Sequence, residues 1–236
     1  MKCVVVIPAR LSSTRISEKP LADLAEKPLI QRVFENASQM KNSDEIVIAA
    51  DSQKVFDVVE GFGGKCILTP PELASGSDRV HYIVEKYYAE ADIVVNLQGD
   101  EPFIDTDIVD LLIDTIAKED CGVMSAYFPV NPDIAEDSSV VKVVMDKAGM
   151  ALYFSRSKIP NGAQIYNKHI GVYVWKRENL KRFHAEGPSE LEKTERLEQL
   201  RVLEYGEKIK LLESSADSLG IDTMEDLEKA RRIING

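Results

Sequence analysis

The stretch MKCVVVIPARLSSTRISEKP, residues 1–20, decides the fold. Its segment from Cys3 to Ile7 is a continuous apolar run rich in β-branched residues, which is typical of a strand buried on both faces. Pro8 has no backbone N–H, so it is expected to mark the end of this strand. A short polar loop follows, with three cations and three hydroxyls, at Arg10, Ser12, Ser13, Thr14, Arg15 and Lys19.

This loop suits an anionic ligand, above all a triphosphate. Guanidinium groups hold phosphate oxygens in pairs, an ammonium acts as a point charge, and hydroxyls and backbone N–H groups occupy the remaining acceptors. Neither G-x-x-x-x-G-K-[ST] nor G-x-G-x-x-G occurs in the chain, which argues against kinases and dehydrogenases. A solvated basic turn is the alternative, but so many cations in one loop of an acidic chain favour a phosphate site.

The composition limits the class of protein. The chain has 236 residues, 44% of them apolar, enough for one large α/β domain. With 29 basic and 40 acidic residues the net charge is −11, which argues against nucleic acid or an anionic membrane as partner. No apolar run approaches the roughly 18 residues of a membrane span. Without a signal sequence, an odd number of widely spaced cysteines predicts free thiols in the cytoplasm, at Cys3, Cys66 and Cys121.

Strands and helices alternate through the first 130 residues. Alternation of this kind predicts a Rossmann-like, mostly parallel sheet of the α/β class, covered by helices on both sides. Ligands of such sheets bind beyond the carboxyl ends of the strands. The predicted strands span residues 45–50, 65–68, 93–97 and 123–128, and the predicted helices span residues 29–37, 53–62, 78–88 and 107–117.

After about residue 130 the pattern changes. We interpret this half as a mixed, antiparallel extension of the same sheet that covers the ligand cleft and makes a subunit contact. No break in composition marks a linker, so residues 1–236 are expected to form a single domain. The predictions are a hairpin over residues 140–145 and 151–155, strands over 168–175 and 208–213, a charged helix over 190–204, and a closing helix over 224–234 capped by Thr223.

Two carboxylates stand out: Asp100 after the predicted strand 93–97, and Asp222 after a short apolar segment. In QGDEP, residues 98–102, the glycine allows backbone to approach a ligand closely, and Asp100 is placed to bind Mg²⁺, which takes one or two carboxylates with phosphate oxygens and water. A polar turn is the alternative there. Asp222 precedes a predicted helix and alone is as well explained as a helix cap. Together with the cationic loop, the two carboxylates predict a metal–triphosphate site.

The segment ASGSDR, residues 74–79, is a turn of small residues that leads into a helix. Such a turn would let a flat base lie against backbone, with Arg79 close enough to hydrogen-bond to it. A simple helix N-cap by Ser77 explains the same residues equally well.

Cations at predicted strand ends could hold a carboxylate-bearing co-substrate, namely Arg156 and the pair Lys168–His169. His169 alone would more often be an ordinary polar residue. Glu198 and Gln199 lie on the charged helix, where a solvated helix face is the alternative. Spacing alone therefore predicts an Mg²⁺-dependent enzyme acting on a nucleoside triphosphate, and leaves the base and the acceptor open.

Seven motifs occur in order along essentially the whole chain. As a set they resemble the 3-deoxy-manno-octulosonate cytidylyltransferases, the CMP-Kdo synthetase family, and the later motifs separate this family from the sialic-acid cytidylyltransferases. The motifs are IPAR (7–10) with STR (13–15) and KPL (19–21), SGSDR (75–79), QGDEP (98–102), ALYFSR (151–156), HIG (169–171), LEQLR (197–201) and GIDT (220–223).

The resemblance implies a nucleotidyltransferase domain of the glycosyltransferase-A-like type that converts CTP and Kdo to CMP-Kdo and pyrophosphate for lipopolysaccharide synthesis. It also implies Mg²⁺ as cofactor, a homodimer, a nucleotide-binding half over about residues 1–130 and a sugar-binding and dimerisation half over about residues 131–236.

The resemblance also implies roles for individual residues. The catalytic set is Arg10, Arg15 and Lys19 on the triphosphate with Asp100 and Asp222 on Mg²⁺. The nucleotide-binding set is Pro8, Ala9, Arg10, Ser13, Arg15, Lys19, Ser75, Gly76 and Arg79. The sugar-binding set is Gln98, Arg156, His169, Glu198 and Gln199.

The chain departs from the family pattern at a few positions. Ile16-Ser17-Glu18 stands where Leu-Pro-Gly or similar is expected, which places an anion beside the phosphates, and the segment 161–167 is shorter than expected. A cytidylyltransferase for a related sugar acid, such as 8-amino-Kdo or a nonulosonic acid, is the nearest alternative function. A silent nucleotide-binding protein is a second alternative, but it predicts loss of Lys19, Asp100 or Asp222, and all three are present.

Overall fold

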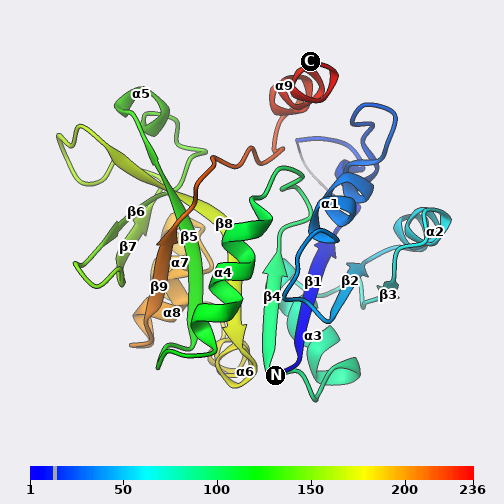
Figure 1. Cartoon of the computed structure of the whole chain (residues 1–236), viewed down its shortest axis with the longest axis horizontal. Helices are drawn as coiled ribbons and strands as arrows, with labels where there is room; N and C mark the ends of the chain where they lie inside the picture. The colour runs from blue at the N-terminus through cyan, green and yellow to red at the C-terminus, as the bar shows by residue number, and fades with distance from the viewer. Residues whose placement is uncertain (13–14) are drawn as a thin grey trace.

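The computed structural model describes residues 1–12 and 15–236. Its strands form one sheet in the order β3-β2-β1-β4-β8-β5-β9, with the β6–β7 hairpin joined to β8 (Figure 1). Within the described residues the strands are β1 (Cys3–Ala9), β2 (Glu45–Ala50), β3 (Cys66–Leu68), β4 (Ile93–Leu97), β5 (Val123–Val130), β6 (Lys142–Met145), β7 (Ala151–Ser155), β8 (Tyr166–Lys176) and β9 (Ile209–Glu213).

The sheet is parallel in its first half and mixed in its second. Strands β3, β2, β1 and β4 run parallel, and β9 is parallel to β5. Strand β8 is antiparallel to β4, β5 and β6, and the β6–β7 hairpin is itself antiparallel. The predicted mostly parallel sheet with an antiparallel extension is therefore confirmed.

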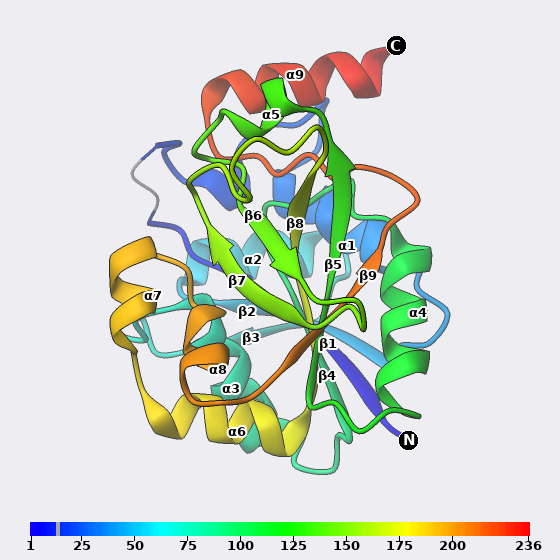
Figure 2. The same ribbon diagram turned by 90° about the vertical axis from the view of Figure 1, so that its left-hand side faces the viewer.

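Helices cover both faces of this sheet. Helices α1, α2, α4 and α9 pack on one face, whereas α3, α6 and α8 pack on the other, and Figure 2 shows α4 and α3 on opposite sides. No helix of the described residues is long and apolar enough to span a membrane. The helices are η1 (Lys19–Leu21), α1 (Leu29–Ala37), α2 (Gln53–Gly61), α3 (Gly76–Tyr87), α4 (Thr106–Ile116), α5 (Pro132–Ala135), α6 (Arg177–Glu186), α7 (Glu190–Glu195), α8 (Leu200–Glu204) and α9 (Met224–Asn235).

Strand β1 is the centre of the core, as its sequence predicts. Val5 and Ile7 point into the hydrophobic cluster on one face, and Val4 and Val6 point into the cluster on the other, all fully buried. Burying each such side chain contributes roughly 1.5–3 kcal/mol, so the central strand is held firmly. The strand continues past Pro8 to Ala9, so the predicted end at Pro8 is wrong. Pairing of β1 with β4 has already stopped at Val6, so the backbone N–H that Pro8 lacks is not needed for a hydrogen bond to β4.

The predicted helix over residues 190–204 is wrong as a single element. The chain forms α7, breaks at Arg196 in the left-handed conformation (φ 57°), and resumes as α8. Helix α6, with only Leu180 and Phe183 buried, was not predicted because its sequence is mostly polar. The N-cap of α3 is Ser75 instead of Ser77, since its hydroxyl accepts from the backbone of Asp78 and the Asp78 carboxylate accepts from the backbone of Ser75.

The carboxyl ends of β1 and β4 approach each other closely at Gly99. A Cβ on Gly99 would lie 2.6 Å from the carbonyl oxygen of Pro8, so only glycine fits between the two strand ends. One residue further on, the carbonyl of Asp100 accepts from the backbone N–H of Ile221 at 2.9 Å. These contacts hold three distant chain segments together at the edge of the sheet where ligands of α/β folds bind.

We expect Gly99→Ala to destabilise the protein, because the added methyl group meets backbone that cannot move aside. Overpacking of this kind costs about 1–3 kcal/mol, which in a domain of this size lowers Tm by several degrees in a thermal melt. Gly61→Ala is the matched control, since nothing lies within 4 Å of its Cβ and it ends α2. A Gly99→Ala protein as stable as the Gly61→Ala control would contradict the close approach.

Candidate active site

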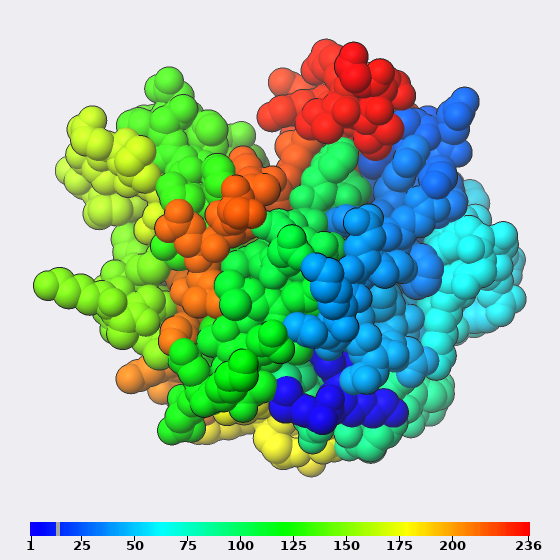
Figure 3. All heavy atoms as spheres, viewed as in Figure 1, coloured from blue at the N-terminus to red at the C-terminus, as the bar shows by residue number. Residues whose placement is uncertain are grey.

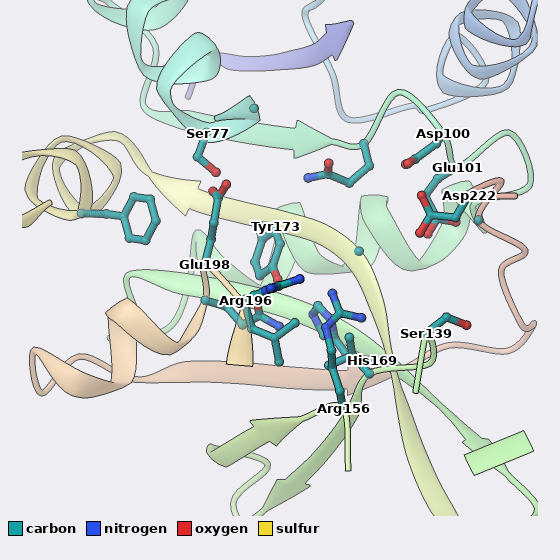
Figure 4. A pocket seen from close by; sticks show the side chains of 18 of the residues that line it. Ser77, Asp100, Glu101, Ser139, Arg156, His169, Tyr173, Arg196, Glu198 and Asp222 are labelled. Atoms are coloured by element: carbon teal, nitrogen blue, oxygen red, sulfur yellow. The ribbon is translucent and has the colours of Figure 1, made fainter. Parts of the chain in front are cut away.

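Two cavities lie side by side at the carboxyl edge of the parallel strands. The first, here called the loop cavity, has a volume of about 420 Å³ and is walled by the end of β1 and the basic loop. The second, here called the sheet cavity, has a volume of about 300 Å³ and is walled by β8, by Arg156 just after β7 and by the α7–α8 break (Figure 4). The residues that line both cavities are Gly76, Gln98, Asp100 and Asp222.

Lys19 is the central charge of the loop cavity. Its Nζ lies 2.5 Å from Oδ2 of Asp100 and 2.8 Å from Oδ1 of Asp222, while Arg15 lies 3.0 Å from the same Asp222 oxygen. Burial alone would lower the pKa of Lys19, but the two carboxylates outweigh burial and raise it. Burial would likewise raise the pKa of Asp222, but Lys19 and Arg15 lower it. The structure thus brings Arg15, Lys19, Asp100 and Asp222 of the predicted catalytic set into contact, and Arg10 lines the same cavity.

The cap interpretation of Asp222 is not supported. The N-cap of α9 is Thr223, whose hydroxyl accepts from the backbone of Asp226, so the Asp222 carboxylate is left to face the cavity.

Asp100 and Asp222 fit Mg²⁺ only together with a phosphate. Within the described residues no group of three or more His, Cys, Asp or Glu side chains could hold a metal ion. Two carboxylates bound to one ammonium form the partial site expected for Mg²⁺, which usually completes its shell with phosphate oxygens and water. Mg²⁺ binding therefore stays a prediction.

The remaining loop residues wall the cavity. Pro8, Ala9 and Arg10 line it, and the Arg10 guanidinium donates to the carbonyl of Ala74 at 3.0 Å. Gly76 lines both cavities, and because it has no side chain, the backbone at the start of α3 is accessible there. Ser75 acts as the N-cap behind Gly76, and Ser13 lies outside the described residues.

Arg79 does not reach either cavity among the described residues, which corrects its prediction as a direct nucleotide contact. Its side chain is completely buried and donates to Thr69 Oγ1 at 2.5 Å and to the carbonyls of Pro70, Pro71 and Leu73. Burial lowers the pKa of Arg79, while Asp51 at 3.9 Å opposes the shift. Arg79 therefore holds the loop that precedes Ser75 and acts on the cavity only through it.

His169 lines the sheet cavity as a neutral imidazole, which corrects its prediction as a cation. Burial lowers its pKa to about 3, and its Nε2 lies 2.9 Å from the hydroxyl of Ser125. The neighbouring Lys168 is bound to Asp217 at 2.7 Å and to the carbonyl of Ser218 at 2.6 Å, so it supports a loop instead of offering a free charge. The cationic wall of this cavity must come from arginine.

The other predicted sugar-side residues do line the sheet cavity. Glu198 and Gln199 sit in the α7–α8 break, and Gln98 follows β4. Burial raises the pKa of Glu198, against a hydrogen bond with Ser77. Arg156 donates through Nε to the carbonyl of Glu195 at 3.3 Å.

Further side chains line the sheet cavity without having been predicted; the polar ones are Ser77, Glu101, Ser139, Tyr173 and Arg196, and the apolar ones include Val141, Trp175, Phe183 and Leu197. Tyr173 could have been found, because residues 169, 171 and 173 alternate onto one face of β8. Nothing in the sequence marks Ser139 or Arg196, since each depends on how a turn folds.

The sheet cavity continues into an open groove of about 770 Å³ that lies between α5 and α9. The groove and the sheet cavity have seven lining residues in common, all outside these two helices. Figure 3 shows the hollow beside the red C-terminal helix. One floor residue is Glu101, which accepts a short hydrogen bond from Ser218 and lies 3.0 Å from where a Cβ of Gly220 would stand. Burial, then the charge of Asp100, raise the pKa of Glu101 to about 7.

Comparison with known proteins gives a consistent result. A family model described as cytidylyltransferase matches residues 4–209. The 3-deoxy-manno-octulosonate cytidylyltransferases of Chlorobaculum tepidum and Thermodesulfovibrio yellowstonii are each 43% identical to this chain, over 99% and 100% of it and over 97% and 99% of their own lengths.

Solved structures agree with these relatives. A CMP:2-keto-3-deoxy-manno-octonic acid synthetase complexed with CTP superposes with a TM-score of 0.94 at 38% identity, covering 100% of this chain and 99% of the other. A cytidylyltransferase from Leptospira borgpetersenii, at 17% identity and a TM-score of 0.67 over 100% and 87% of the two chains, shares the fold.

We expect His169→Gln to change how stability depends on pH. In the unfolded chain His169 takes up a proton below about pH 6.5, whereas the folded protein keeps it neutral down to about pH 3. The wild-type protein therefore loses stability as pH falls through this window, at up to about 1.4 kcal/mol per pH unit, and the variant lacks this loss. Thermal melts from pH 7.5 to 4.5 should show the Tm advantage of wild type over variant shrinking as pH falls. A constant difference would refute the buried neutral imidazole.

Proposed function

The chain belongs to the 3-deoxy-manno-octulosonate cytidylyltransferases, and on this premise we propose that it transfers CMP from CTP to Kdo, releasing pyrophosphate. The observation that carries the proposal is the junction of the two cavities at Asp100 and Asp222. A basic loop on one side suits a triphosphate, and an arginine-bearing polar cavity on the other suits a sugar acid.

The reaction needs positioning and charge neutralisation more than covalent work. The anomeric hydroxyl of the sugar acid attacks the α-phosphorus in line and gives its proton to water, and pyrophosphate leaves with the bonding electrons of the broken P–O bond. Arg10, Arg15 and Lys19 bind the triphosphate and offset the charge that gathers on the leaving group. Lys19 remains charged at neutral pH because its pKa is raised.

We propose that Asp100 and Asp222 hold Mg²⁺ when CTP binds. Held there, Mg²⁺ would offset negative charge at the phosphate oxygens and make the attacking hydroxyl more acidic. For Lys19 to serve the phosphates, its ammonium would exchange its contacts with Asp100 and Asp222 for contacts with the nucleotide.

Three further parts of the proposal follow the family. We propose a homodimer and a role in lipopolysaccharide synthesis, as the resemblance implies. A cytoplasmic location is also proposed, in keeping with the three free cysteines.

Release of pyrophosphate tests the proposed function directly. The purified protein is incubated with CTP and Mg²⁺ and with Kdo, 8-amino-Kdo or a sialic acid, with UTP as nucleotide control and EDTA as metal control. We expect release with CTP and Kdo that EDTA abolishes. Release only with another sugar acid would change the proposed substrate but not the proposed reaction type. No release with any sugar acid would refute the proposed cytidylyltransferase activity.

Asp100→Asn is expected to lower kcat by roughly two orders of magnitude or more, because a neutral amide is a weak Mg²⁺ ligand. The change keeps the shape of the side chain, so Tm should stay close to that of wild type. Asp114→Asn, at an exposed position on α4, is the matched control and should leave turnover unchanged. Turnover of Asp100→Asn equal to this control would remove Asp100 from the metal site.

Arg15→Lys is expected to raise KM for CTP about three- to tenfold, because lysine keeps the charge but loses the paired N–H donors that match phosphate oxygens. Arg182→Lys, on the exposed face of α6, is the control for the same substitution. Steady-state kinetics at saturating Kdo measure the effect. An unchanged KM for CTP would show that Arg15 serves only its ion pair with Asp222.

A further inference from the structure

Arg196 occupies an unusual backbone position at the rim of the sheet cavity. It ends α7 in the left-handed conformation, with φ 57° and ψ 47°, and its backbone N–H donates to the carbonyl of Glu192. Non-glycine residues rarely adopt this conformation, which costs free energy. In this chain it turns the backbone so that the next three residues, Leu197, Glu198 and Gln199, also line the cavity.

The guanidinium of Arg196 has no hydrogen-bond or ion-pair partner among residues 1–12 and 15–236. Nearby arginines differ, because Arg201 is bound to Glu192 by two contacts of 2.7 Å and Arg156 donates to the carbonyls of Glu195 and Ser138. Arg196 nevertheless lines the cavity with its five N–H donors unused. Such a group is available to a ligand.

Glu195 places Arg156 and Arg196 on the same wall. Its carboxylate accepts from the hydroxyl of Ser155 at 2.8 Å and from the backbone of Arg156 at 3.2 Å, and its carbonyl accepts from Arg156 Nε. The end of α7 is thereby tied to the end of β7, so the two arginines are neighbours although they are far apart in the sequence. Figure 4 shows their nitrogen-bearing ends gathered near His169.

Most charges of the sheet cavity are separated. Asp100, Glu101 and Asp222 lie at the end next to the loop cavity, whereas Arg156 and Arg196 lie across from them (Figure 4). Glu198 also lines the cavity near Arg196, but it is hydrogen-bonded to Ser77 and burial raises its pKa. A carboxylate entering the cavity is repelled from the first end and attracted to the second. Since His169 is neutral and Lys168 is bound elsewhere, the attraction at that wall comes from the two arginines.

We propose that Arg196 is a substrate-binding residue that acts with Arg156 to hold the carboxylate of the sugar acid. This inference rests on the proposed function, because it takes a sugar acid as the ligand. Two guanidinium groups present planar forks of N–H donors that match the two oxygens of a carboxylate. Arg196 thus contributes to selection of an acidic sugar over a neutral one, without taking part in the transfer of CMP.

Arg196→Gln tests the proposal, with Lys193→Gln as the matched control. Lys193 lies three residues earlier on α7, is paired with Glu190 and does not line the cavity. A charge-assisted hydrogen bond of this kind predicts a KM for Kdo raised about tenfold or more. KM for CTP and kcat should stay within about twofold of wild type, and Arg196→Lys should recover part of the loss. An unchanged KM for Kdo overturns the proposal, and so does a rise confined to CTP.

Direct titration separates this proposal from the proposed function. Kdo is titrated calorimetrically into wild type and Arg196→Gln with CTP present and Mg²⁺ removed by EDTA, so that binding is measured without turnover. Weaker Kdo binding by Arg196→Gln supports the proposal even if wild type shows no pyrophosphate release, in which case the proposed function alone fails. Equal binding by the two proteins, or no binding of Kdo by wild type, overturns the role of Arg196.

Discussion

The site depends on one ammonium group placed between two carboxylates. Lys19 lies 81 residues from Asp100 and 203 from Asp222 in the sequence, yet its Nζ is within 2.8 Å of both. Two carboxylates that share one neighbour repel each other, and a cation between them offsets this repulsion. Lys19 therefore holds the two carboxylates together at the junction of the two cavities.

The rest of the fold supports this arrangement. The central strands are buried on both faces, which fixes the position of their carboxyl ends. The loops that follow these ends carry the polar side chains of the site. Gly99 lets the ends of β1 and β4 meet, and the carbonyl of Asp100 holds the segment before α9 through Ile221. The mixed half of the sheet then adds a second cavity to the same edge.

Prediction from sequence succeeded where local pattern and tertiary structure agree. The β-branched run at residues 3–7 and the alternating elements up to residue 130 lie where the periodicity places them. Prediction failed where the same side chain can either bind a ligand or support the fold. Arg79 sits in a motif that suits a ligand, but backbone carbonyls of residues 70–73 take its donors, and His169 loses its charge because it is buried.

The sequence by itself determined the residue types of the site, the strands that carry them and the class of chemistry, because these follow from local composition and spacing. The tertiary structure alone decided which side chains meet, which stay charged and which hold neighbouring loops in place. The break at Arg196 is an example: the charged sequence continues through it, yet the helix ends there, beside the hydrogen bonds of Glu195 to Ser155 and Arg156. Contacts between distant segments and the loss of water around a buried group are properties of the folded chain, and no local pattern encodes them.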